Sequence, residues 1–296
     1  MIGASFARQE RPTRRLPRQR CPFVVVLGTN GIASAVSVGL HRDGCSVALL
    51  HDPSPPVIRR GMAFHDVLYD DPCILEGITG RRADDWPEVL GALDAPNAVA
   101  VTRLALSDLI ACRAIDVLVD GRMQKHTMTP DLRHLAGIPV GLGPGFHVGS
   151  NCDVAIETHP AKCGKLVEVG ATDLADGVPS PLGEVGRERF AYAPVTGRWR
   201  TAVEIGTRVF KEFAVGHLDG HPVPAPLDGI LRGVVRDSLA VPVAKLLEID
   251  PRGRKARSTS ACATSLRLFV RHPRPCHVAC GATDRARRKP RAPAST

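Results

Sequence analysis

Short apolar runs alternate with segments of helical spacing through the first half of the chain. Residues 23–27, Phe-Val-Val-Val-Leu, form a continuous apolar run that is typical of a strand buried in a parallel sheet. A glycine-containing turn follows, and residues 32–40 then carry apolar side chains at helical spacing before Gly44, a typical C-terminal cap. Residues 47–50 form a second apolar run that ends at His51-Asp52. The pattern predicts a strand–helix–strand unit whose crossover is long enough for a parallel pair.

The same alternation continues to about residue 150. Apolar runs predict strands at 98–101, 115–119 and 138–142, and helical spacing predicts helices at 106–112 and 132–136. Strands that alternate with helices in this way are typical of a doubly wound sheet. We therefore expect an α/β fold, with a Rossmann-like parallel-sheet domain over residues 22–175.

The pattern changes after residue 150. Two further strands are predicted at 154–158 and 165–169, and a Gly/Pro-rich linker follows at 176–186. An internal repeat then begins, because Ala193-Pro194-Val195-Thr196-Gly197 recurs as Ala225-Pro226-Leu227-Asp228-Gly229. A β-rich stretch follows each copy, at 203–209 and at 239–247. A repeat of this length indicates two intertwined halves of one small all-β domain, residues 186–253.

This repeat resembles biotinyl/lipoyl-type barrel-sandwich domains, in which an Ala-Pro-x-x-Gly turn opens each half. In those carriers the resemblance places a lysine at the hairpin tip between the halves. Here the tip reads Leu218-Asp219-Gly220-His221 and holds no lysine. We therefore expect a structural or docking role for this domain, without lipoyl or biotin attachment.

The charge of the chain is concentrated at its two ends. The net charge is +9, but residues 1–20 carry +5 and residues 252–296 carry +11, which leaves residues 21–251 at about −7. Basic tails bind polyanions without sequence preference, so we expect no specific nucleic-acid partner. Residues 1–21 and 254–296 are predicted to be disordered.

Other broad classes are excluded by composition. No apolar run approaches the roughly 20 residues of a membrane span, and the N-terminus lacks the apolar core of a signal peptide. We expect a cytoplasmic protein with no membrane partner. The nine cysteines include no Cys-x-x-Cys motif, and reduced thiols are expected. Cys276, His277 and Cys280 lie in the basic tail, and we predict no metal site.

The first candidate site is the turn after the first strand. Aligned with the dinucleotide fingerprint, which lets the backbone approach a pyrophosphate at a helix N-terminus, it offers Gly28, Asn30 and Ala33. Asn30 stands where the phosphates come close, and Gly31 compensates only if the turn is shifted. Asp52 lies where an acid would meet a ribose hydroxyl. A site for a nucleotide or pterin cofactor and a purely structural turn both fit this pattern.

Two other loops belong to the same edge of the predicted sheet. Arg59 and Arg60 follow the second strand, and paired arginines suit a phosphate or carboxylate, or else a solvated loop. Gly141, Gly143 and Gly145 follow the strand at 138–142 and let the backbone approach a ligand or bend sharply. No Ser-His-Asp arrangement is visible. His65, Asp66, Asp116 and Asp120 are interpreted as isolated polar residues.

An ordered set of motifs across residues 23–253 resembles one family. The motifs are Ile58-Arg59-Arg60 with Ala63-Phe64, Leu75-Glu76-Gly77-Ile78, Gly141-Leu142-Gly143-Pro144-Gly145-Phe146, Ile156-Glu157-Thr158, Ala225-Pro226-Leu227-Asp228-Gly229 and Asp250-Pro251-Arg252-Gly253. They are similar to those of the accessory proteins of the selenium-dependent molybdenum hydroxylase system (YqeB-like). The resemblance implies a Rossmann-like domain, a C-terminal barrel-sandwich domain and a role in maturing hydroxylases of the xanthine dehydrogenase type. The family turn usually reads Gly-x-Gly-Asp, from which Gly28-Thr29-Asn30-Gly31 departs.

These observations combine into one hypothesis and two alternatives. We expect an accessory protein rather than a turnover enzyme, binding a nucleotide-bearing cofactor of the molybdopterin or dinucleotide type and docking a client molybdenum hydroxylase or a second copy of itself. The alternatives are an NAD(P)-dependent oxidoreductase and a ligand-free protein-interaction module. The expected cofactor-binding residues are Gly28, Asn30, Gly31, Asp52, Arg59, Arg60, Gly141, Gly143 and Gly145.

Overall fold

The computed structural model describes residues 21–125 and 128–253. The basic segments 1–20 and 254–296, for which the sequence predicts disorder, lie outside these ranges, as do Cys276, His277 and Cys280. Within the described ranges no helix has the length and apolarity needed to cross a bilayer.

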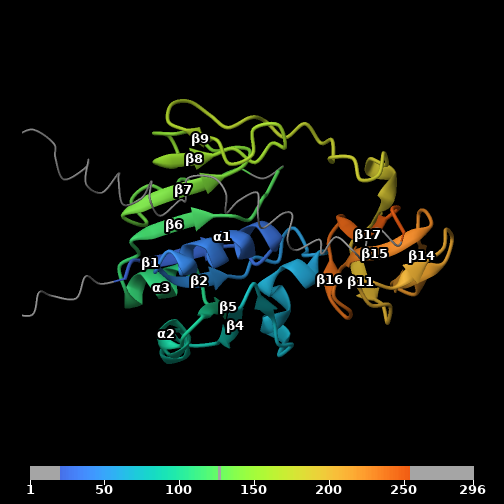
Figure 1. Ribbon diagram of the computed structural model, residues 1–296, viewed down its shortest axis with the longest axis horizontal. Helices are drawn as coiled ribbons and strands as arrows, with labels where there is room; N and C mark the ends of the chain where they lie inside the picture. Colours follow the sequence, from blue (N-terminus) through green and yellow to red (C-terminus); the bar gives the residue numbers. More distant parts are fainter. Residues whose placement is uncertain (1–20, 126–127, 254–296) are drawn as a thin grey trace, which may run out of the picture.

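A nine-stranded sheet forms the centre of the first part of the molecule (Figure 1). Its strands are β1 (Phe23–Leu27), β2 (Ser46–Leu50), β3 (Ile74–Leu75), β4 (Ile78–Ala83), β5 (Ala98–Thr102), β6 (Val117–Asp120), β7 (Ile138–Leu142), β8 (Val154–Ile156) and β9 (Leu166–Val167). Their order is β3-β4-β5-β2-β1-β6-β7-β8-β9. Neighbours from β4 to β8 are parallel, and only the edge strands β3 and β9 pair antiparallel.

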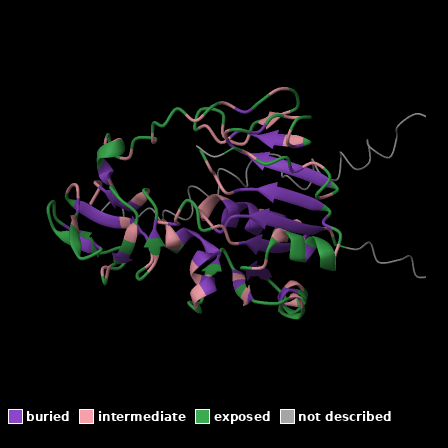
Figure 2. Ribbon diagram, turned by 180° about the vertical axis from the view of Figure 1, so that it is seen from behind, coloured by how far each residue is buried: buried purple, intermediate pink, exposed green. Residues whose placement is uncertain are grey.

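Both faces of this sheet are covered, which explains its continuous apolar strands. Helix α1 (Gly31–Arg42) packs on the face that carries Val24 and Val26, together with the 3₁₀ turns η1 (Arg60–Met62) and η2 (Phe64–Tyr69). Helices α2 (Trp86–Asp94) and α3 (Leu106–Cys112) pack on the face that carries Phe23 and Val25. All of β1 is buried, and the strands are buried along most of their length (Figure 2). The sheet and its covering segments, residues 23–167, are called the α/β part below.

The predicted strands of this part are confirmed, with ends that move by up to two residues. The predicted helix at 106–112 is α3, but the helix predicted at 132–136 is wrong, because these residues form an irregular turn. His134 has φ +70° there, a left-handed conformation that cannot continue a helix. The sequence pattern also missed β3, β4 and α2.

The second part of the molecule, residues 190–250, consists of two antiparallel sheets and is called the β part. Its strands are β10 (Phe190–Tyr192), β11 (Gly197–Arg200), β12 (Arg208–Val209), β13 (Ala214–Leu218), β14 (His221–Pro224), β15 (Gly229–Val234), β16 (Ala240–Val241) and β17 (Lys245–Asp250), preceded by the 3₁₀ turn η3 (Arg187–Arg189). The sheet orders are β10-β17-β15-β12 and β14-β13-β11-β16. Asp219 and Gly220, both with positive φ, form the two-residue hairpin between β13 and β14.

The internal repeat generates this arrangement. Its two copies are 32 residues apart, from Ala193 to Ala225. Exchanging equivalent strands of the two halves (β10 with β14, β11 with β15, β12 with β16, β13 with β17) converts one sheet order into the other. The hydrogen bonds obey the same rule. Trp199 N donates to the Leu239 carbonyl at 2.9 Å, and Leu231 N donates to the Thr207 carbonyl at 2.8 Å. Each sheet therefore takes strands from both halves.

The two parts meet where the segment after β2 lies against β15. The Val234 amide donates to the Ile58 carbonyl at 2.8 Å, and a Cβ added to Gly233 would lie 3.0 Å from that same oxygen. Figure 1 shows the carboxyl ends of β6 and β7 pointing toward the β part. The β part therefore packs beside the sheet edge at which the sequence predicts a ligand.

Candidate functional site

The loops after β1 and β6 touch at the carboxyl edge of the sheet. Gly28 has φ +102°, and a Cβ added there would lie 3.2 Å from both the Gly121 oxygen and the Arg122 Cα. Glycine is needed at position 28 for its backbone conformation and for this contact. The two strands also flank the point at which the strand order reverses, where ligands bind in open α/β sheets.

Asn30 occupies the N-terminus of α1 with its own side chain. Its Oδ1 accepts from the amides of Ile32 at 2.9 Å and Ala33 at 3.1 Å, as an N-cap residue does. Its Nδ2 donates to the Gly121 carbonyl at 2.7 Å and so ties the loop after β1 to the loop after β6. Gly31, the first residue of α1, faces the Met62 carbonyl of η1. The amides that would hold a pyrophosphate in the Rossmann manner are thus already used.

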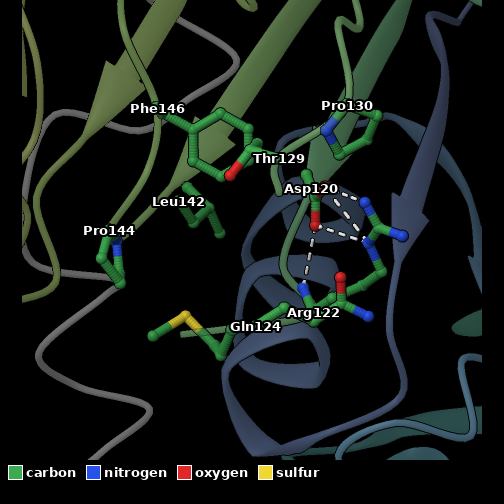
Figure 3. A pocket seen from close by; sticks show the side chains of 9 residues that line it. Asp120, Arg122, Gln124, Thr129, Pro130, Leu142, Pro144 and Phe146 are labelled. Atoms are coloured by element: carbon green, nitrogen blue, oxygen red, sulfur yellow. Dashed lines mark hydrogen bonds and ion pairs between the residues drawn. The ribbon is translucent and has the colours of Figure 1, made fainter. Parts of the chain in front are cut away.

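Arg122 lies between two carboxylates at this edge, and Figure 3 shows its contact with one of them, Asp120. Its Nη2 is 2.6 Å from Asp120 Oδ2, and its Nη1 is 3.4 Å from Asp52 Oδ2. Gln124 joins the same group by donating to Asp52 at 3.2 Å and to the Ser54 carbonyl at 2.9 Å. The hydrogen bonds that Arg122 donates to Asp120 raise the pKa of Arg122, against the opposing effect of burial. Asp52, Asp120, Arg122 and Gln124 are called the edge network below.

A shallow pocket lies beside the edge network, between the ends of β6 and β7. Arg122 and Asp120 form one side, and Leu142, Pro144 and Phe146 form the other (Figure 3). The volume within it that a water-sized sphere can reach is about 10 Å³, far below the roughly 300–1,000 Å³ of small-molecule sites. As it stands, the pocket is too small for a nucleotide, and a ligand would have to move its side chains.

The glycines after β7 shape the wall of this pocket. A Cβ added to Gly141 would lie 2.1 Å from the Phe146 ring, so glycine lets that ring fold back over the strand. Gly143 and Gly145 both have positive φ, and the Gly143 carbonyl accepts from Thr172 Oγ1 at 2.6 Å. The Gly141–Phe146 motif therefore builds a tight turn whose outer residues line the pocket.

A second polar group lies at the ends of β1 and β2. The buried Thr29 hydroxyl is 3.0 Å from Nδ1 of His65 and 3.5 Å from Nδ1 of His51. The His51 and His65 rings are 5.3 Å apart, and Tyr69 stacks on the other side of His65 at 5.5 Å. One hydroxyl between two imidazoles can accept a hydrogen bond from one ring while it donates a hydrogen bond to the other.

Burial lowers the pKa of both of these histidines. For His65, burial and the positive charges of Arg60, Arg236 and Arg103 lower the pKa to about 3. Burial and the charge of Arg103 also lower the pKa of His51. Thr29 and His65 are buried, so this group links the ends of β1 and β2 from inside the protein.

Arg59 and Arg60, expected at the ligand edge, lie instead between the two parts. Arg59 makes two hydrogen bonds to Glu248, at 2.7 and 3.0 Å. Arg60 pairs with Asp66 at 2.6 Å and donates to the Val234 carbonyl at 3.0 Å. Arg236 of the β part also pairs with Asp66 and Asp71. Both predicted arginines therefore have protein partners in this structure.

The structure brings together most of the predicted site residues and adds others. Gly28, Asn30 and Asp52 meet at one edge, and the Gly141–Gly145 turn lies across the pocket from Arg122. Sequence reasoning treated His65 and Asp120 as isolated and did not mention Arg122. The sequence did contain a signal for Asp120. This residue stands at the end of a strand, and Asp52 likewise follows a strand, so both belong to the same edge of the sheet. Across the described ranges, no group of three or more His, Cys, Asp or Glu residues is arranged to hold a metal ion.

The fold and this edge define a mixed α/β protein with a mostly parallel sheet, a polar crevice at the strand-order reversal and an attached β part. The chain is similar to the protein named "Uncharacterized protein YqeB" of Escherichia coli strain K12, at 31% identity over 240 residues. This match covers 80% of the chain and 44% of YqeB, so the chain spans less than half the length of that curated relative. The similarity supports a relationship to the YqeB-like family. No protein-family model and no solved structure matches the chain.

Proposed function

We propose that the chain is an accessory protein for a molybdenum hydroxylase and binds a nucleotide-bearing cofactor at the carboxyl edge of a Rossmann-like α/β part. The observation that carries the ligand site is the strand order, which reverses between β1 and β6. Loops leave a sheet on opposite sides at such a reversal and open a crevice for nucleotides. The hydroxylase role is supported by the sequence resemblance to the YqeB-like accessory proteins.

The pocket residues are the proposed contacts with the organic part of the ligand. Gln124 and Thr129 supply polar groups, and Phe146 supplies an apolar surface for a planar ring. Leu142 and Pro144 of the Gly141–Gly145 turn also line the pocket, whereas Gly28 and Asp52 lie behind it, against Arg122. The phosphates bind elsewhere in this proposal, because the Asn30 side chain takes two amides of the α1 N-terminus.

The β part is proposed to be a barrel-sandwich domain that docks the client hydroxylase or a second copy of the chain. The exchange of its two sheets by the repeat supports this assignment. In the resemblance to biotinyl/lipoyl carriers, the attachment lysine would stand at the β13–β14 tip, where Asp219 and Gly220 are found. Docking without a carried group is therefore the proposed role.

A ligand-free interaction module is the second candidate, and a specific observation favours it. Asn30, Arg59 and Arg60 already bond to groups of the protein itself. An NAD(P)-dependent oxidoreductase is less well supported, because its pyrophosphate would compete with the Asn30 cap. The two remaining candidates differ in one measurable property, which is stabilisation by a small molecule.

A thermal-denaturation screen of the full chain against NAD, NADP, FAD, ATP, CTP and molybdopterin tests the proposal. A ligand at 100 times its Kd stabilises a protein by about 2.7 kcal/mol. We expect stabilisation by at least one of these ligands, reduced in Thr129→Val and unchanged in Thr207→Val, an exposed threonine of the β part. No stabilisation by any of them in a folded sample would refute cofactor binding and leave the interaction module.

A further inference from the structure

Cations outnumber carboxylates at the junction between the two parts. Glu248 of β17 is fully buried, and three guanidinium groups approach its carboxylate. Arg59 Nε lies 2.7 Å away, Arg189 Nε 3.0 Å away, and Arg232 Nη1 4.0 Å away. Lys245 lies beside them, with its Nζ 3.9 Å from the centre of the Phe190 ring. Arg59, Arg189, Arg232, Lys245 and Glu248 are called the junction cluster below.

The remaining charges around this cluster do not balance it. Asp250 pairs with Arg252 at 2.7 Å, which leaves that pair neutral. Lys125, which follows the edge network, adds a further positive charge near Lys245. The four cations of the cluster therefore face Glu248 and, at Arg232, the Asp250 carboxylate that Arg252 already holds, and burying charge without a partner is costly.

Arg232 shows that the cluster has unused binding capacity. Its side chain is 15% exposed, and its Nε is buried with no hydrogen-bond partner in the described part of the chain. Burial and the charge of Arg59 lower the pKa of Arg232. Burial and the charges of Lys125, Arg59 and Arg189 lower the pKa of Lys245 to about 8. In both groups burial and neighbouring cations outweigh the attraction of Glu248 and, at Arg232, of Asp250.

The β fold itself does not require this arrangement. Arg200 takes the place of Arg232 in the other half of the repeat, 32 residues earlier. Its side chain is 57% exposed, and its cross-strand neighbour is the exposed His217 rather than a buried carboxylate. The cluster is thus specific to the half of the repeat that faces the α/β part.

We propose that the junction cluster binds a phosphate group, with Arg232, Arg59 and Lys245 as its contacts. The flat guanidinium fork bonds phosphate through two N–H groups at once, and a dianion matches the excess of positive charge better than a carboxylate does. Arg59 is 37% exposed and leaves the cluster open to solvent on its side. The inference deepens the proposed function, because it supplies the phosphate site that α1 does not.

Binding of inorganic phosphate to the full chain tests this site directly. Phosphate is titrated at constant ionic strength set by sodium chloride, with calorimetry and melting temperature as readouts. We expect saturable binding to the wild type and about tenfold or weaker binding to Arg232→Met, since a charged hydrogen bond is lost. Arg200→Met is the matched control and should bind as the wild type does. Lys245→Met is a second variant and should also weaken binding.

The melting temperature without phosphate separates a binding role from a purely structural one. Glu248 keeps Arg59 and Arg189 when Arg232 is replaced, so Arg232→Met should melt at or above the wild-type temperature in chloride while losing the gain in phosphate. The pKa of Lys245, measured by NMR at its Cε, should rise from about 8 when phosphate binds. Equal gains in wild type and Arg232→Met, or no gain beyond chloride, would overturn the phosphate site.

Nucleotides and nucleosides distinguish this inference from the proposed function. Binding of phosphate without a response to any nucleotide upholds the junction site and refutes the cofactor role. Nucleoside binding that depends on Thr129, with no effect of phosphate, refutes the junction site alone. Nucleoside monophosphates that bind more tightly than either component, and lose that advantage in Arg232→Met, support both.

Discussion

The edge network and the junction cluster hold their charges in opposite proportions. At the edge, one guanidinium, that of Arg122, lies between the carboxylates of Asp120 and Asp52. At the junction, the single carboxylate of Glu248 faces Arg59, Arg189 and Arg232. The edge network satisfies its cation from within the chain, whereas the junction cluster leaves positive charge over. The ion pairs of the edge network hold the loops after β2 and β6 together. The junction cluster has an excess of positive charge, which a bound anion would neutralise.

The largest expected effect comes from replacing Glu248, the carboxylate that the cations of the junction cluster share. Glu248→Gln leaves three guanidinium groups without their buried counter-charge, and we expect a loss of about 3–5 kcal/mol in the free energy of unfolding. Urea denaturation measures it, with the exposed Glu204→Gln as control. Adding Arg232→Met should restore part of the loss. A double variant less stable than Glu248→Gln alone would show that the cations are not in excess.

Removing the central cation of the edge network has a smaller expected effect. Arg122→Met leaves the nearly buried Asp120 without its partner, and an unmatched charged group of this kind costs roughly 2 kcal/mol. The same denaturation experiment measures it. Phosphate should stabilise this variant as much as the wild type, because the edge network is not the phosphate site. If phosphate no longer stabilised this variant, the edge network would be part of the phosphate site, and the two regions would not be independent.

The pH dependence of stability tests the buried histidine beside the edge, whose pKa is lowered mainly by burial and not by the junction cluster. His65 titrates near 6.5 when unfolded and near 3 when folded, so its contribution is complete above pH 6.5 and is lost as the pH falls toward 3. Between pH 6.5 and pH 5 this amounts to about 1.5 kcal/mol. His65→Gln should flatten the stability profile in that window. An unchanged slope in this variant would assign the dependence to other groups, His51 first.

The weakest expected effect concerns the cap of α1. Asn30→Ala removes an N-cap and also the bridge to the Gly121 carbonyl, with an expected loss of about 1–2 kcal/mol. Asp85→Ala removes the cap of α2, whose Oδ1 accepts from the Glu88 amide, and should cost about 0.5–1 kcal/mol. The difference between the variants measures the bridge. Equal losses would mean that the two loops are held together without it.

The elements that sequence predicted well are those whose pattern is set by local burial. β1 and β7 lie inside the sheet, and both occur where continuous apolar runs predict them. β4 was missed because Arg81 and Arg82 interrupt its apolar positions, although it pairs with β5 along its length. The pattern gave no role to the side chain of Glu157, which is buried and accepts from three backbone amides, two of them within two residues.

The sequence predicted which loops lie at the site but not which residues pair with one another there. Strand ends placed Gly28, Asp52 and Gly141 at one edge, because the carboxyl ends of parallel strands share an edge. The partner of Arg59 could not be predicted, since Glu248 lies 189 residues further along the chain. Neither could Arg122, whose role depends on the contact between two loops at Gly28. Which charged side chains remain available to a ligand therefore depends on ion pairs between residues far apart in the sequence.

The exchange of strands between the halves of the β part also orders events during synthesis of the chain. β10 pairs with β17, the first strand with the last, and β15 pairs with the same last strand. The sheet that contains β17 cannot be completed before residue 250 has left the ribosome, and the other sheet of the β part cannot be completed before residue 241 has done so. The strands of the nine-stranded sheet, in contrast, all precede residue 168. The nascent chain can assemble its first part while the second is still being translated. Glu248 lies on β17, the last strand, so the ion pair between Glu248 and Arg59 is among the last contacts to form between the two parts.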